Sequence, residues 1–274
     1  MRDCLIVIAS FADGFLDELL TSIEENTKDV DYVIQVVDNH RNRKLIEETV
    51  VKVCKEHNVP YHLDINITGY GDALNTGVEV SNEDTKYVLY MDSDTKVAKG
   101  WLREMINCYE RNYDKGCRLV GPLVKNFNNK YLNIMSHYRA DGNVSKLEGV
   151  DTHLTTCYLV GVCYLRERST INEFKWDKNF FRAYAEDMDF AKQVLYLKYS
   201  MFVSGKALMY HSVNSSHKTM KDEGHNPSNV AGKNRNYLNE KWKHIDTYKK
   251  TVTPEVLNGS TMTRDDKEEI LSVK

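Results

Sequence analysis

Two acidic clusters and one histidine are the residues of this sequence best suited to chemistry. The first cluster, Asp92-Ser93-Asp94, follows directly after the apolar run Tyr87 to Met91. Alternate residues that leave a strand end can both turn toward one ligand, and two carboxylates there suit a hard divalent cation or a ribose diol. A polar loop with an Asp turn is the simpler interpretation, because two aspartates at this spacing often occur by chance.

The second cluster, Ala185-Glu186-Asp187-Met188-Asp189, opens a helix predicted over Glu186 to Tyr199. Acidic residues at a helix start are commonly just favourable partners of the helix dipole. The functional interpretation is a general base at the mouth of a pocket, with aromatic side chains just upstream that are suited either to stacking on a sugar or to core packing.

The histidine is His211, which ends a predicted short strand. A lone histidine is more often a surface or core residue than a ligand. Its position after a strand and downstream of two acidic clusters makes it a candidate third metal ligand through a neutral imidazole. His217 and His225 follow in a loop rich in Ser and Asn, and we assign neither of them a role.

The first hundred residues alternate strand and helix patterns, which predicts a doubly wound, mostly parallel α/β sheet covered by helices. The predicted strands are 4–9, 32–37, 61–67 and 87–91, and the predicted helices are 16–23, capped by Asp13, then 43–57 and 72–80. In such sheets ligands bind beyond the carboxyl ends of the strands. Ser10, Asp38-Asn39 and Asp92-Ser93-Asp94 all follow strands, so the sequence predicts a binding site there.

Past Gly100 the alternation is less regular and predicts a smaller mixed sheet and a closing helix. The predicted elements are a helix over 101–113, a strand over 119–124, a polar excursion over 125–149, a long strand over 155–165, short strands over 201–203 and 207–210, and a helix over 231–248. The last stretch, 251–274, is polar and is expected to be a loosely attached tail.

Composition excludes several classes of protein. The chain has 274 residues, 41% hydrophobic and 28% charged, which is typical of a soluble globular protein. Its 37 basic and 40 acidic residues give a formal charge of −3, which argues against a nucleic-acid coat. The six cysteines show no C-x-x-C spacing and are expected to be reduced. No integral membrane segment and no leader peptide is predicted. A cytoplasmic location is therefore expected.

Taken in order, these features resemble the family-two glycosyltransferases, which have the A-type nucleotide-sugar fold. The residues that carry the resemblance are Leu5 to Phe11, Val36 to Asn39, Gly71 to Gly77, Tyr87 to Asp94, Phe180 to Asp189, Tyr210-His211 and Asn234 to Trp242. The chain departs from the family at Ala9-Ser10-Phe11, where Pro, Thr and an aromatic are usual, and at Asp38-Asn39-His40-Arg41.

The resemblance implies a role for each matching residue. Asp38 would contact the base, Asp92 the ribose or a metal-bound water, and Asp94 and His211 would hold Mn²⁺ or Mg²⁺. Asp187 would take the proton from the acceptor hydroxyl. The residues implied to bind the nucleotide sugar are Ala9, Ser10, Phe11, Asp38, Asp72, Asp92 and Ser93.

The resulting hypothesis is a metal-dependent inverting glycosyltransferase that uses a nucleoside-diphosphate sugar, UDP-linked by preference. Residues 1–100 would bind the donor, residues 101–250 the acceptor, and 251–274 would form the tail. A saccharide acceptor is the first expectation. The second is hydroxymethylated DNA, which the basic stretch 205–250 permits, although a solvated face explains that stretch equally well. Two further hypotheses are a nucleotidyltransferase and a non-catalytic nucleotide-sugar binding protein.

Overall fold

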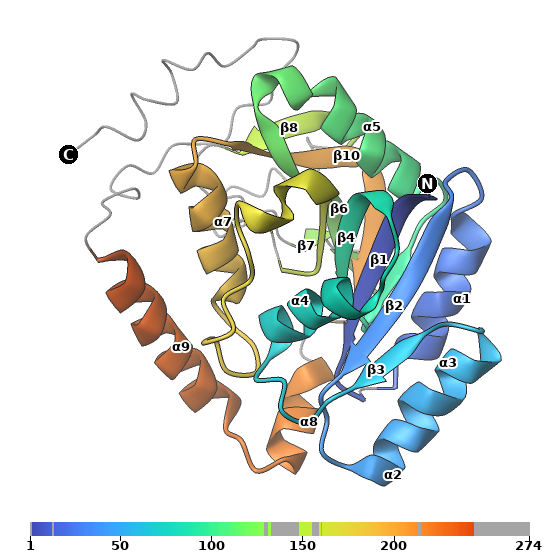
Figure 1. Ribbon diagram of the computed structural model, residues 1–274, viewed down its shortest axis with the longest axis vertical. Helices are drawn as coiled ribbons and strands as arrows, with labels where there is room; N and C mark the ends of the chain where they lie inside the picture. Colours follow the sequence, from blue (N-terminus) through green and yellow to red (C-terminus); the bar gives the residue numbers. More distant parts are fainter. Residues whose placement is uncertain are drawn as a thin grey trace.

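One mixed sheet runs through the molecule, a computed structural model that describes residues 2–12, 14–128, 131–132, 148–154, 159, 161–212 and 215–243 (Figure 1). Its strands are β1 (Arg2–Ser10), β2 (Tyr32–Asp38), β3 (Tyr61–Leu63), β4 (Thr85–Asp92), β5 (Thr95–Val97), β6 (Cys117–Asn126), β7 (Tyr131–Leu132), β8 (Asp151–Leu154), β9 (Cys163–Glu167) and β10 (Ser200–His211). The order across the sheet is β3-β2-β1-β4-β9-β6-β10-β5, with β7 on β6 and β8 on β10.

The N-terminal half of the sheet is parallel and contains a topological switch. The strands β3, β2, β1 and β4 pair in parallel, and β4 returns to the opposite side of β1 from β2. Beyond β4 the pairing is mixed, since β9 is antiparallel to β4 and β6 while β10 is parallel to β6. A crevice forms where the strand order reverses, so the carboxyl ends of β1 and β4 are where a ligand is expected.

Helices cover both faces of the sheet. They are α1 (Leu16–Asn26), α2 (Arg43–Ile46), α3 (Lys52–Glu56), α4 (Tyr70–Val80), α5 (Trp101–Arg111), α7 (Glu186–Tyr196), α8 (Ser215–Asp222) and α9 (Pro227–Trp242), and a π-helical turn (Glu47–Val51) joins α2 to α3. Along β1, Ile6 and Ile8 belong to the core under α1 and α5, whereas Leu5 and Val7 belong to the core under α4 and α7. Burial on both faces explains why residues 4–9 of β1 are an unbroken apolar run.

The structure confirms the α/β class and the mostly parallel sheet, and it corrects two predicted strands. The predicted long strand 155–165 is wrong: β8 ends at Leu154, Gly161-Val162 form a turn, and β9 begins only at Cys163. A glycine within an apolar run often marks such a bend. The two predicted short strands 201–203 and 207–210 are one strand, β10, with an irregularity between Ser204 and Leu208.

The predicted helix 231–248 begins earlier, at Pro227, where the Asn226 side chain caps α9 by accepting from the Ser228 N–H at 3.0 Å. The strands β5 and β8 and the helix α8 were not predicted from the sequence. The predicted cap Asp13, most of the excursion 125–149, Cys157 and the tail 251–274 lie outside the described residues.

The described cysteines, Cys4, Cys54, Cys108, Cys117 and Cys163, are free and buried. Of the helices in the described ranges, none combines the length and the apolar character needed to span a bilayer.

Candidate active site

A cavity of about 410 Å³ opens at the carboxyl ends of β1, β4 and β10, a volume typical of small-ligand sites. Its lining brings together residues from both halves of the chain: Ala9, Ser10, Phe11, Asn39, Tyr70, Ala73, Asp92, Ser93, Asp94, Gly161, Val162, Arg182, Ala183, Tyr184, Ala185, Glu186, Asp187, Met188, His211, His217, Met220, Ala231 and Arg235. Of the site residues predicted from the sequence, only Asp38 and Asp72 are not in this lining.

Asp92, Asp94 and His211 form a compact group on one wall. Their ligand atoms lie within 4.8 Å of one another, with His211 Nε2 3.2 Å from Asp94 Oδ1 and 3.9 Å from Asp92 Oδ2. Strand pairing creates this group, because β10 runs antiparallel to β5 with His211 opposite Thr95. The Ser212 N–H also donates to the Asp94 carbonyl oxygen at 2.9 Å, which holds the end of β10 against the turn after β4.

The chemistry of these three donors fits Mn²⁺ or Mg²⁺. Two carboxylates supply hard oxygen ligands, and an imidazole is an accepted ligand for first-row divalent metals. Three protein ligands on the wall of an open pocket leave coordination positions for substrate oxygens. The residues present therefore fit a catalytic rather than a closed structural site.

Tyr70, at the start of α4, lies beside the same group. Its hydroxyl donates to the Gly161 carbonyl oxygen at 2.7 Å, and burial, followed by the charge of Asp92, raises the pKa of this tyrosine well above its ordinary value. Tyr70 therefore stays protonated and neutral next to the acidic group. Apart from its place between Gly69 and Gly71, nothing in the sequence singles this tyrosine out.

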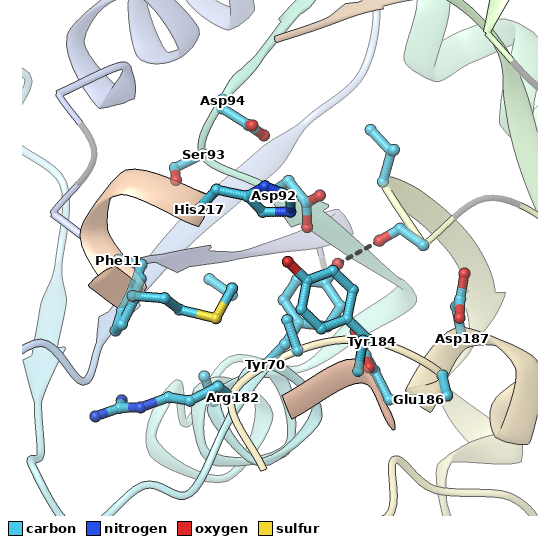
Figure 2. A pocket seen from close by; sticks show the side chains of 18 of the residues that line it. Phe11, Tyr70, Asp92, Ser93, Asp94, Arg182, Tyr184, Glu186, Asp187 and His217 are labelled. Atoms are coloured by element: carbon cyan, nitrogen blue, oxygen red, sulfur yellow. Dashed lines mark hydrogen bonds between the residues drawn. The ribbon is translucent and has the colours of Figure 1, made fainter. Parts of the chain in front are cut away.

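Glu186 and Asp187, in the first turn of α7, lie on a different wall from Asp94 (Figure 2). Burial is the largest cause that raises the pKa of Asp187, to about 6, and hydrogen bonds from the backbone of Met188 and Gly161 oppose it. Burial and the charge of Asp187 raise the pKa of Glu186 to about 8. Burial thus favours the protonated form of both neighbouring carboxyls, and a carboxyl of this pair that is ionised can accept a proton.

Ser10 and Phe11, from the end of β1, and Asn39, after β2, line another part of the pocket. Asp38 lies behind them at 1% exposure, where its two oxygens accept from the Ala12 N–H and the His40 N–H, each at 2.8 Å. Burial raises the pKa of Asp38 to about 6. Asn39, and not Asp38, lines the pocket, so the contact between Asp38 and a base stays a prediction from the sequence.

Asp72 has a local structural role in α4. Its Oδ2 accepts from the Thr68 N–H at 2.9 Å and from the Thr68 hydroxyl at 3.2 Å, which satisfies donors just before the first turn of the helix. Asp72 therefore stabilises the start of the helix rather than the pocket wall.

Helix α8 covers part of the pocket with His217 and Met220. The His217 ring lies edge-on to Tyr184, with ring centroids 5.9 Å apart, and Figure 2 shows both rings over the pocket. Glu223, just after α8, holds this cover in place: its Oε2 lies 2.5 Å from Arg182 Nη2 and its Oε1 accepts from the Arg41 N–H at 3.1 Å. Tyr184 is one of the aromatic residues that the sequence offered for stacking on a sugar. His217, Arg182 and Glu223 received no role from the sequence, because their partners lie far away along the chain.

Comparison with known proteins gives a family for this architecture. The model of the family described as "Glycosyl transferase family 2" matches residues 4–169, more than half of the chain. The chain belongs to glycosyl transferase family 2. The match includes Asp92 and Asp94 but ends before Asp187 and His211. No curated protein matches the sequence.

Solved glycosyltransferase structures share the fold of this family-2 chain. A GalNAc-T7 structure with UDP, GalNAc and Mn²⁺ superposes with a TM-score of 0.60 at 13% identity, over 77% of this chain and 44% of that one. The S. aureus TarS fragment 1–349 gives 0.56 at 16% identity, over 89% and 72%. The same fragment in complex with UDP-GlcNAc gives 0.55 at 15% identity, over 88% and 73%. The chain thus spans less than half of the GalNAc-T7 chain, and these likenesses show the A-type glycosyltransferase fold.

Proposed function

We propose that this family-2 chain transfers a sugar from a UDP-linked donor to an acceptor hydroxyl, with inversion at the anomeric carbon and with Mn²⁺ or Mg²⁺ as cofactor. The observation that carries the proposal is that the Asp92–Asp94–His211 group and the carboxylate of Asp187 line one pocket at the switch point of the sheet. The UDP, UDP-GlcNAc and Mn²⁺ named with the similar structures support the donor and the metal.

Asp94 and His211 would hold the metal, and Asp92 would contact it or the ribose. A bound divalent cation stabilises the negative charge that develops on a departing diphosphate. Asp187 accepts the proton of the acceptor hydroxyl as the new C–O bond forms on the face opposite the breaking bond to the diphosphate. Help of this kind from a general base contributes about 10²–10⁴-fold to a rate.

The two halves of the chain receive different substrates in this proposal. Residues 1–100 supply Ser10, Phe11, Asn39 and the aspartates at the end of β4 and just beyond it, and we assign donor binding to this half. Residues 101–250 supply α7, α8 and α9, and we assign acceptor binding and the general base to them. The tail 251–274 receives no role.

We propose a saccharide acceptor. Tyr70 and Tyr184 line the same pocket as Asp187, and tyrosine rings combine an apolar face with a hydroxyl that can bond to sugar hydroxyls (Figure 2). Hydroxymethylated DNA is the competing acceptor. Transfer to such DNA, accompanied by salt-sensitive binding to the duplex, would replace the saccharide in this proposal.

The test is release of nucleoside diphosphate from a panel of nucleotide sugars, with and without Mn²⁺. We expect metal-dependent release from one donor, lost in Asp94→Ala. Asp187→Asn should abolish release while leaving nucleotide affinity intact. Failure of UDP, GDP and TDP to bind with metal present would refute the proposal, and tight binding without turnover onto any acceptor would indicate a binding module instead.

A further inference from the structure

The loop that leads into α7 has an unusual backbone. Arg182, Tyr184 and Ala185 have φ angles of 60°, 82° and 70°, so three of the four residues 182–185 are left-handed although none is a glycine. Side chains with a Cβ disfavour this region, and such conformations persist only where the surroundings hold them. Asp187, the proposed base, follows two residues after Ala185.

The side chain of Asn234, on α9, holds this loop. Its Nδ2 donates to the carbonyl oxygens of Phe181 at 2.9 Å, Ala183 at 2.8 Å and Tyr184 at 3.1 Å, and its Oδ1 accepts from the Phe181 N–H at 3.3 Å. Asn234 is only 4% exposed. The pattern fixes the orientation of the amide, because the reverse orientation would place Oδ1 against three carbonyl oxygens.

The same helix also contacts α7 itself. Trp242 Nε1 donates to Asp189 Oδ1 at 2.7 Å, and Lys241 Nζ lies 2.9 Å from Asp189 Oδ2. Figure 1 shows α9 alongside α7 on the outside of the sheet. Helix α9 therefore anchors both the loop before Asp187 and the helical turn after it. It lies beyond residues 4–169, the part of the chain that the family model matches.

We propose that Asn234 is a positioning residue for sugar transfer: it holds the loop 181–185 in its left-handed conformation and thereby directs Asp187 into the pocket. Asn234 is not in the pocket lining, so it acts through the loop rather than on substrate. This inference rests on the proposed function. The metal ligands Asp92, Asp94 and His211 lie on other elements, namely β4, the turn after it and β10.

The test uses Asn234→Asp in the full chain. The substitution keeps the size of the side chain but replaces the donor with an oxygen that faces three carbonyl groups. We expect kcat for hydrolysis of the donor sugar to fall by about 10²-fold, the effect typical of a misplaced catalytic group, with a much smaller change in the Kd of UDP in the presence of Mn²⁺. Asn234→Ala, which adds no charge, should likewise lower kcat far more than it changes the Kd of UDP. Asn236→Asp, at an exposed position on the same helix, is the matched control and should retain wild-type kcat and Kd.

A rescue experiment separates positioning from a general loss of folding. Glycine adopts φ near +70° without penalty, so Ala185→Gly added to Asn234→Asp should restore part of kcat. Wild-type kcat in both Asn234 variants would overturn the inference, as would an equal loss of kcat and UDP affinity that Ala185→Gly does not relieve. If the wild-type chain itself neither hydrolyses a nucleotide sugar nor binds UDP with Mn²⁺, the proposed function fails and the inference fails with it.

Discussion

Replacing Glu223 with glutamine is expected to destabilise the fold strongly, because it leaves the Arg182 guanidinium buried without its counter-ion. The two side chains are 5% and 3% exposed, and their closest atoms lie 2.5 Å apart. The introduced glutamine keeps an oxygen that can accept from the Arg41 N–H, so the substitution mainly removes charge. The guanidinium has other neighbours, but none of the following can replace a carboxylate. They are the ring of Phe11 at 5.0 Å, the ring of Phe181 at 5.4 Å and the Asn39 carbonyl oxygen, to which the guanidinium makes a long hydrogen bond.

The size of the effect follows from this burial. Removing one partner of a buried ion pair costs about 3–5 kcal/mol. Since about 1 kcal/mol shifts the Tm of a domain of this size by roughly 2–4 °C, the Tm should fall by roughly 6–20 °C. The pair Lys243–Glu240 is the matched control: its atoms lie 2.6 Å apart, but the side chains are 50% and 71% exposed. Glu240→Gln should change the free energy of unfolding by less than about 0.5 kcal/mol.

The assay is urea unfolding of Glu223→Gln, Arg182→Met and the double variant. We expect the double variant to be less destabilised than the sum of the single ones, because no unpaired charge remains buried. A loss below about 1 kcal/mol in Glu223→Gln would refute the reasoning, since it would mean that water already solvates Arg182 in the folded protein.

Three further predictions concern the metal, the pH profile and the core. Asp94→Ala should abolish the Mn²⁺ dependence of UDP binding in titration calorimetry, because it removes one of three clustered ligands; metal-dependent binding that survives would place the ion elsewhere. The kcat of donor hydrolysis should fall as the pH drops through about 6. Burial raises the pKa of Asp187 to about 6, and a protonated base cannot accept a proton. A fall in kcat centred near pH 4, the ordinary pKa of an aspartate, would contradict a buried base. Gly77→Ala should destabilise the fold by about 1–3 kcal/mol in urea unfolding, because the Cβ of the introduced alanine would lie 2.3 Å from Val7 Cγ1. Unchanged stability would mean that α4 can shift away from β1.

Local sequence patterns were sufficient to predict the main strands and helices of the N-terminal half of this protein, although not β5. Buried parallel strands are continuous apolar runs and covering helices show a helical period, so β1, β2, β4 and α4 can be predicted from neighbouring residues alone. The rule that ligands bind at the carboxyl ends of parallel strands then selected Ser10 and Asp92-Ser93-Asp94, and the structure places both in the pocket.

The way in which the second half completes the site depends on contacts between distant segments. His211 reaches Asp94 because β10 pairs with β5, a three-residue strand too short to give a pattern. Asn234 forms hydrogen bonds with residues 50–53 positions away, and Glu223 forms an ion pair with Arg182, which lies in the loop before α7. Such contacts leave no local periodicity, because a hydrogen bond or ion pair between distant segments depends on where the chain returns in space. The same reason explains why Asp38, which follows a strand as the rule requires, bonds to backbone behind the pocket, while Asn39 faces it.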